Sequence, residues 1–165
     1  MNQLPAGYVL RRMTSADVEQ VHDLDVRSFS LPWPKRSFEM EVQNPASQGW
    51  VITAPPQGDA MPAVIAMALV WVILDEAHIA TFAVDAEYRQ QGIGSFLLAS
   101  ILETLKALGV QHIFLEVRCT NTAAQALYAR AGFKVIDVRK GYYTDTHEDA
   151  LVMMLTITNT RSQLT

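Results

Sequence analysis

Two residues of the chain have the side-chain chemistry of a proton-transfer pair. Glu116 lies inside an otherwise apolar run, residues 113–117. A carboxylate in such a run must be paired, hydrated or functional, so Glu116 is either a general base or the ion-pair partner of an arginine such as Arg118. Tyr128 follows twelve positions later in a run with helical spacing. A phenol of pKa about 10 keeps its proton at neutral pH, so Tyr128 is either a general acid or a core tyrosine with a polar tip.

A glycine-rich turn, Arg89–Gly94 (Arg-Gln-Gln-Gly-Ile-Gly), has the composition of a phosphate-binding segment. It follows the strand-like run 78–84 and opens the helical run 92–108. Glycine lets a ligand approach the backbone, and the first turn of a helix presents unsatisfied N–H groups and partial positive charge. A dinucleotide fingerprint would need glycine at Leu97, and a P-loop would need Lys where Ser95 stands. The pattern alone is equally compatible with a helix start that contains two glycines.

The remaining periodicities predict the elements that must position these residues. Runs rich in β-branched and aromatic residues alternate with runs whose apolar residues recur at helical spacing. Their order is a strand, two helices, three strands, a helix, a strand, a helix and two strands. This order predicts an α+β fold, a mostly antiparallel sheet of about seven strands with helices on both faces. We expect strands over 8–12, 50–53, 63–74, 78–84, 112–118, 133–138 and 150–157, and helices over 14–25, 35–43, 92–108 and 121–131.

Composition narrows the class of protein. The 165 residues, half of them hydrophobic and 18% charged, fit one globular domain with a core of about 8–157 and a tail, 158–165, without a motif. The net charge of -4 argues against nucleic-acid binding as the main function. A lone cysteine, Cys119, no signal-peptide pattern and no bilayer-length apolar run indicate a soluble cytoplasmic protein. We expect no membrane contact, an inert Cys119 and, from four histidines without ligand spacing, no metal.

Three further segments complete a family pattern. The strand end 115–118 (Leu-Glu-Val-Arg) is followed by Asn121, by 126–128 (Ala-Leu-Tyr) and by 132–133 (Gly-Phe). Together with the Arg-x-x-Gly-x-Gly turn, they resemble the GNAT superfamily of acetyltransferases over nearly the whole chain, 8–155. Within that superfamily the chain is similar to the ribosomal-protein-alanine N-acetyltransferases. The segments that carry this second likeness are 29–34 (Phe-Ser-Leu-Pro-Trp-Pro), 115–118, 139–143 (Arg-Lys-Gly-Tyr-Tyr) and 148–150 (Glu-Asp-Ala).

Two positions depart from the group's usual pattern. Thr120 stands where a serine is usual, which retains a hydroxyl, and the turn 55–62 is longer than we expect.

The resemblance implies acetyl transfer from acetyl-CoA to an amine, with Glu116 as base and Tyr128 as acid. It also implies that the strand end 82–84 contacts the acetyl and pantetheine groups through its backbone, while the glycine-rich turn holds the pyrophosphate. Asn121 would contact the cofactor, although asparagine also serves as a helix N-cap. The implied cofactor-binding residues are Phe82, Ala83, Val84, Arg89, Gln90, Gln91, Gly92, Ile93, Gly94, Ser95 and Asn121.

The acceptor side rests on aromatic residues of two loops. We expect the site between the turn that carries Leu31 and Trp33 and the segment that carries Tyr142 and Tyr143, although plain packing on a sheet edge would use the same residues. A protein α-amine has a pKa near 8, against about 10.4 for lysine, so one carboxylate can suffice as its base.

The expected acceptor is the N-terminal alanine of a small-subunit ribosomal protein. Broader protein N-terminal or lysine acetylation is an alternative, as is acetylation of a small amine, for which Asp145, Glu148 and Asp149 could form an acidic pocket. A non-catalytic acetyl-CoA-binding module is disfavoured because mere binding needs neither Glu116 nor Tyr128.

Overall fold

A computed structural model describes residues 3–158 of the chain. Within that range the strands form one seven-stranded sheet in the order β1-β2-β3-β4-β5-β7-β6. All neighbouring strands are antiparallel except β4 and β5, which are parallel. The predicted mixed sheet and its antiparallel meander are confirmed. The strands are β1 (Val9–Arg12), β2 (Ser47–Ala54), β3 (Ala63–Ile73), β4 (Glu76–Val84), β5 (His112–Arg118), β6 (Lys134–Tyr143) and β7 (Glu148–Thr156), and the α-helices are α1 (Val18–Ser28), α2 (Lys35–Gln43), α3 (Ile93–Ala107) and α4 (Thr122–Arg130).

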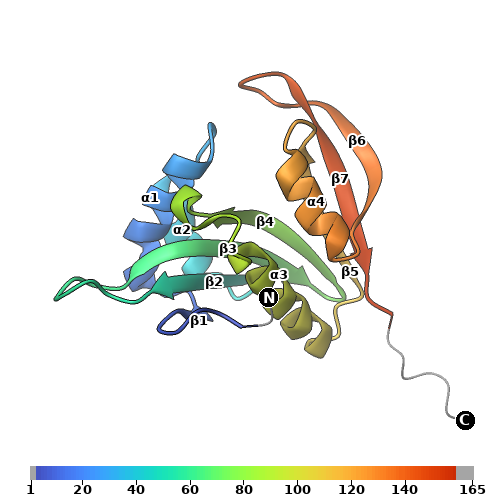
Figure 1. The fold of residues 1–165 in the computed structure, drawn as a ribbon. Coiled ribbons are helices and arrows are strands. Elements are labelled where there is room, and N and C mark those ends of the chain that lie inside the picture. The colour runs from blue at the N-terminus through green and yellow to red at the C-terminus, as the bar shows by residue number, and fades with distance from the viewer. Residues whose placement is uncertain (1–2, 159–165) are drawn as a thin grey trace, which may run out of the picture.

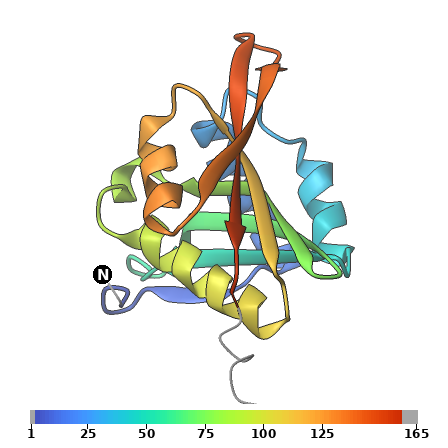
Figure 2. The same cartoon turned by 90° about the vertical axis from the view of Figure 1, so that its right-hand side faces the viewer.

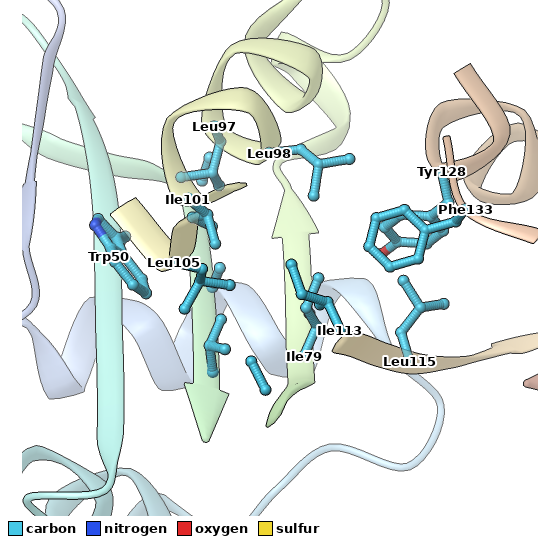
Figure 3. Close-up of a cluster of buried hydrophobic side chains, with 14 of the residues drawn as sticks. Trp50, Ile79, Leu97, Leu98, Ile101, Leu105, Ile113, Leu115, Tyr128 and Phe133 are labelled. Carbon is cyan, nitrogen blue, oxygen red and sulfur yellow. The ribbon is translucent and has the colours of Figure 1, made fainter. Parts of the chain in front are cut away.

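Helices cover both faces of the sheet because alternation along the strands makes both faces apolar. On β2, Trp50 and Ile52 pack in the cluster that contains the buried stripe of α3, whereas Val51 packs with α1 and α2. Figure 2 shows α3 crossing the strands. Figure 3 shows the α3 side chains Leu97, Leu98, Ile101 and Leu105 against Ile79 and Ile113, with Tyr128 and Phe133 closing the cluster at one end.

The end of α3 fixes how the chain enters β5. Gly109 adopts a positive φ of 84°, which glycine accepts without strain. Its N–H bonds to Lys106 O at 3.1 Å, and the Val110 N–H bonds to Leu105 O at 3.1 Å. These two bonds form a Schellman motif, and the buried side chains of Val110 and Leu105 share one core. Gly109 therefore ends α3 next to the predicted helix end at 108.

The sheet separates at its centre. β4 and β5 pair only at Glu76–His112, Ala77–Ile113 and His78–Phe114, the first residues of β4. Beyond these pairs the strands diverge, and in Figure 1 the part made of β5, β6, β7 and α4 stands at an angle to the rest. A register shift against β3 leaves Ala80 as an extra residue between Ile79 and Thr81. Such a bulge bends a strand, here at the point where β4 leaves β5.

Several predicted boundaries are wrong: β2 begins at Ser47 instead of 50, α1 ends at Ser28 instead of 25, and two further differences concern β6 and the start of α1. The strand expected to end at residue 138 continues as β6 to Tyr143, which pairs with Glu148, so Tyr142 and Tyr143 belong to a strand end rather than to a connecting segment. The register shifts twice along β6, and its Lys-Gly sequence at 140–141 resembles a turn locally. The helix expected to open at Thr14 begins as a 3-10 turn, Ser15–Asp17, before α1. The described helices include none that is long and apolar enough to cross a bilayer.

Candidate active site

A cavity of about 480 Å³ opens between the diverging parts of β4 and β5. Its walls include β4 from His78 to Phe82, β5 from Leu115 to Arg118 and the inner side of α4. The α1–α2 connection and the end of β6 also line it. The structure therefore gathers the following predicted residues around one space: Leu31, Trp33, Phe82, Glu116, Asn121, Tyr128, Tyr142 and Tyr143.

Glu116 lies in the β5 wall with 12% of its side chain exposed. Its Oε2 is 2.5 Å from Nε2 of His78, and its Oε1 is 3.5 Å from Nη1 of Arg139. Burial, the largest single influence, pushes the pKa of Glu116 upward. The hydrogen bond from His78 and the charges of His78 and Arg139 outweigh it, so the pKa lies below its ordinary value. Glu116 is therefore an ionised, buried carboxylate facing a cavity.

Tyr128 faces the same cavity from α4. Its ring packs edge-to-face against Phe82 and Phe133, at centroid distances of 6.1 and 5.7 Å. Its hydroxyl makes no hydrogen bond with any of residues 3–158. Burial, and secondarily the nearby Tyr143, raise the pKa of Tyr128 well above its ordinary value. The hydroxyl stays protonated at neutral pH and is free to donate to a group in the cavity.

The separation of β4 from β5 leaves backbone donors of a central strand without a strand partner. The Asp85 N–H bonds to Ile65 O of β3 at 2.8 Å. Successive amides of a strand point to alternate sides, so the N–H groups of Val84 and Phe82 point away from β3, toward the gap. Ala83 directs its own N–H to β3. Among the three predicted residues of the strand end, two thus present amides to a ligand.

The glycine-rich turn begins where β4 ends. Within the described residues, the six backbone N–H groups from Gln90 to Ser95 have no hydrogen-bond partner. Gln90 and Gly92 both have positive φ, 59° and 80°, and Gly92 is the N-cap of α3. This run of free donors at a helix N-terminus is an anion-binding arrangement.

A close approach ties this turn to the cavity. A Cβ at Gly94 would lie 3.4 Å from Val84, 3.7 Å from Leu127 and 3.8 Å from Phe82, whose side chain also lines the cavity. The turn itself does not line the cavity. Arg89 turns back, and its Nε donates to Val84 O at 3.0 Å. Phe82 thus lines the cavity and also lies close to Gly94 of the turn.

Asn121 is a helix N-cap that also lines the cavity. Its Oδ1 accepts the Ala124 N–H at 3.1 Å, which makes it the N-cap of α4, and the residue also lines the cavity. A capping asparagine still has its amide nitrogen available as a donor.

The α1–α2 connection and the end of β6 close one side of the cavity. The buried Asp25 carboxylate accepts the Trp33 N–H at 2.7 Å, which holds the α1–α2 connection in place. Trp33 stacks on Trp71 of β3 with centroids 6.1 Å apart. From the opposite wall, the Arg118 guanidinium lies 4.0 Å from the Tyr143 ring centroid. The predicted loop aromatics therefore line the cavity instead of only covering a sheet edge.

Arg118 links the α1–α2 connection to the turn between β6 and β7. It donates to Asp145 at 3.0 Å and to Ser30 Oγ at 3.0 Å, and Ser30 also donates to Asp145. Glu148 lies 3.5 Å from the same guanidinium. The acidic residues that could have formed a pocket for a small polyamine thus have a cationic partner, and Asp149 is paired with Lys140 at 3.1 Å.

Sequence reasoning named the wrong ion-pair partner for Glu116 and missed another contact. Arg118 points to Asp145 and Glu148, and Arg139 is the arginine near Glu116. His78 received no role from the sequence, although it is the shortest polar contact of Glu116. No local signal marked it, because the bulge at Ala80 places His78 with Trp71 on the sheet face opposite to that of Phe82. Cys119 is exposed, and the described residues hold no cluster of His, Cys, Asp and Glu suited to a metal ion.

Comparison with known proteins decides the family. Residues 18–133 match the model of the acetyltransferase (GNAT) family. The chain belongs to the GNAT family of acetyltransferases. The [ribosomal protein bS18]-alanine N-acetyltransferase of Escherichia coli (strain K12) is 35% identical, over 88% of this chain and 95% of that protein. A Bacillus subtilis (strain 168) protein, provisionally named for the same activity, is 36% identical over 90% of this chain and 95% of its own length.

Solved GNAT structures give the same result. The crystal structure of the ribosomal-protein-S18-alanine N-acetyltransferase from Escherichia coli superposes with a TM-score of 0.83, at 31% identity, covering 96% of this chain and 99% of that one. Arabidopsis thaliana NAA60 in complex with acetyl-CoA has a TM-score of 0.83 at 19% identity and covers 92% of this chain and 99% of that one, a likeness of fold alone. This GNAT chain is an acetyl-CoA-dependent N-acetyltransferase.

Proposed function

We propose that this enzyme acetylates the N-terminal α-amine of a protein, and specifically the N-terminal alanine of ribosomal protein S18. One observation supports the reaction above all others. The ionised, mostly buried carboxylate of Glu116 and the protonated phenol of Tyr128 line the same cavity, beside free backbone amides of β4. The acceptor comes from the relatives, which are named for alanine N-acetylation of this ribosomal protein and match nearly end to end.

The donor acetyl-CoA fits the residues that are present. Free N–H groups from Gln90 to Ser95 suit the pyrophosphate, and Gly94 keeps the path past Phe82 open. The amides of Phe82 and Val84 would bind the pantetheine arm and the thioester oxygen. Donors aimed at a carbonyl stabilise the negative charge that develops on it during attack.

Glu116 and Tyr128 divide the proton transfers. Glu116 takes a proton from the acceptor nitrogen as the C–N bond forms. Tyr128 donates to the departing sulfur, whose thiolate would otherwise be left charged in a buried site. Burial raises the pKa of Tyr128, so it holds its proton until charge develops on the sulfur. The same desolvation acts on the thiolate and raises the proton affinity of the sulfur as well.

The acceptor enters between the two loops. Leu31, Trp33, Tyr142 and Tyr143 provide an apolar, aromatic surface for the first residues of a chain. A small-amine acceptor finds no free acidic cluster here, because Asp145, Glu148 and Asp149 are engaged with Arg118 and Lys140.

The acceptor is tested by mass spectrometry of ribosomal proteins from cells with and without the gene. When the gene is absent, we expect S18 to be about 42 Da lighter, because its N-terminal amine then keeps the hydrogen that an acetyl group would replace. With the purified enzyme, a peptide that begins with the S18 N-terminal sequence should be acetylated on its α-amine and on no lysine. An unchanged set of N-termini would remove S18 as the acceptor.

The catalytic role of Glu116 is tested by Glu116→Gln, which keeps the side-chain shape and removes the base. We expect kcat to fall by about 100-fold or more, in the range of general-base catalysis, with the Kd of acetyl-CoA unchanged. Glu103→Gln, a glutamate of α3 outside the cavity lining, is the matched control and should keep full activity. A fully active Glu116→Gln enzyme would exclude Glu116 from the mechanism.

A further inference from the structure

His78 of β4, the hydrogen-bond partner of Glu116, has properties that a residue with a purely structural role does not need. Nε2 of His78 is 2.5 Å from Glu116 Oε2, and 32% of the His78 side chain is exposed, against 12% for Glu116. His78 lines the cavity beside Glu116. Its ring packs against Trp71 with centroids 5.4 Å apart and an interplanar angle of 33°, a contact that limits its rotation on that side. The histidine therefore connects a buried carboxylate with solvent.

The state of Glu116 determines the tautomer of His78. Because Glu116 is ionised, the short contact requires a proton on Nε2 of the imidazole. A neutral His78 then has its lone pair on Nδ1, the nitrogen on the other side of the ring. No hydrogen bond joins Nδ1 to any of residues 3–158. In its neutral form His78, a residue that lines the cavity, therefore carries a basic nitrogen that is not engaged by any of residues 3–158.

At neutral pH the reaction releases more protons than Glu116 alone can hold. A protein α-amine, with a pKa near 8, is about nine tenths protonated at pH 7. Its nitrogen enters with three hydrogens and keeps one in the amide, so two protons must leave it. One ends on the sulfur of the departing thiol and one goes to solvent. A single carboxylate can hold only one of them at a time.

We propose that His78 is the first proton acceptor of this enzyme, and that it removes the proton that makes the acceptor an ammonium. This inference rests on the proposed function. The N–H bond of the ammonium breaks, an Nδ1–H bond forms, and the resulting imidazolium stays paired with the Glu116 carboxylate until it releases its proton to solvent. Glu116 then takes the second proton as the C–N bond forms. Tyr128 donates its own proton to sulfur and regains the one held by Glu116, so one proton in total leaves the site.

The charged groups around His78 are compatible with this role. Glu116 on β5 faces its Nε2, and Arg139 of β6 lies beyond Glu116 at 3.5 Å. Glu41 of α2 accepts the indole N–H of Trp71, the ring that packs against His78, at 3.0 Å. Asp25 of α1 is turned to the Trp33 N–H, and Tyr143 of β6 has a pKa raised to about 12, largely by burial, and so stays neutral. Glu116 is the one anion in hydrogen-bond contact with His78 among the described residues.

The test is His78→Gln, which retains an N–H donor for Glu116 but cannot hold a proton. The measurement is kcat/KM for an N-terminal peptide at pH 7 and pH 9. We expect a loss of about tenfold at pH 7, because only about one tenth of the amine is then neutral, and a loss of less than about twofold at pH 9, where about nine tenths is neutral. His112→Gln, at the start of β5 and outside the cavity lining, should match the wild type at both pH values.

Two results would overturn the proposal. If His78→Gln equals the wild type at pH 7, the histidine carries no proton. If its deficit is the same at pH 7 and pH 9, His78 only positions Glu116. A structural defect would also appear as a weaker Kd for acetyl-CoA or a lower Tm, neither of which we expect.

A second measurement does not depend on the acceptor. Nitrogen-15 NMR of the wild-type enzyme should show the neutral form of His78 protonated on Nε2 and bare on Nδ1, and Glu116→Ala, which leaves no acceptor for the Nε2–H, should remove that preference. The opposite tautomer in the wild type would refute the role of Nδ1. Failure of the proposed function has a different signature, since the wild-type enzyme would then leave every N-terminal peptide unacetylated.

Discussion

The replacement Tyr128→Phe removes one oxygen atom and separates catalysis from folding. The phenyl ring keeps its edge-to-face contacts with Phe82 and Phe133, and the lost hydroxyl has no hydrogen bond among residues 3–158. No buried partner is left unsatisfied, so we expect the free energy of unfolding to change by less than about 0.5 kcal/mol.

The effect on turnover should be much larger. A general acid contributes about 10²–10⁴-fold to a rate, which corresponds to about 3–5.5 kcal/mol of activation free energy. We therefore expect kcat to fall at least 100-fold, with little change in the Kd of acetyl-CoA. Because the pKa of Tyr128 is raised well above its ordinary value, the wild-type rate should show no loss from ionisation of Tyr128 between pH 7 and pH 10.

The assay is release of free thiol at saturating acetyl-CoA and peptide, with product identity checked by mass spectrometry. Tyr8→Phe, in an aromatic pair with Tyr88 and outside the cavity lining, is the matched control and should keep full activity. A normal kcat in a folded Tyr128→Phe enzyme would refute the role as acid. A fall in kcat accompanied by an equal loss of stability would assign the residue to packing.

Two further substitutions test other parts of the site. Gly92→Ala forces alanine into a φ of 80° at the N-cap of α3. We expect a loss of about 1 kcal/mol in unfolding free energy and at least tenfold weaker acetyl-CoA binding by calorimetry, and an unchanged Kd would argue against a pyrophosphate site there. Burial raises the pKa of Asp25 above its ordinary value of 3.8, so this carboxyl favours the folded state below pH 3.8 and loses that contribution as pH rises through the raised pKa. Asp25→Asn keeps an acceptor for the Trp33 N–H and removes the titration. The unfolding free energy of this variant, relative to that of the wild type, should therefore increase from pH 3.8 toward neutrality. A difference that is constant with pH would contradict this account.

Local signals were sufficient to predict much of the fold. The stripe of apolar residues on α3 and the glycine at its end placed that helix within a residue or two of its observed bounds. The meander of β2, β3 and β4 followed from three consecutive strand runs. These features are set by side-chain periodicity and backbone freedom, which are properties of short segments.

The contacts of the site depend instead on how distant strands align. Whether Glu116 meets Arg118 or Arg139 is decided by the register of β7 against β5 and β6, which the sequence near Glu116 does not contain. His78 meets Glu116 because β4 and β5 are parallel neighbours, although 38 residues separate the two side chains along the chain. The resemblance to a family identified Glu116 and Tyr128, but a resemblance carries only the residues that the family pattern names.

The divergence of β4 from β5 also concerns association between molecules. Unpaired strand edges usually lie at the rim of a sheet, where they can pair with another chain and seed aggregation. Here the exposed edge belongs to two central strands, and it is surrounded by α4, the α1–α2 connection with Trp33 and the end of β6 with Tyr143. The fold thus leaves unpaired backbone N–H and C=O groups accessible to a narrow ligand, while the surrounding elements prevent a strand of another protein from pairing with them.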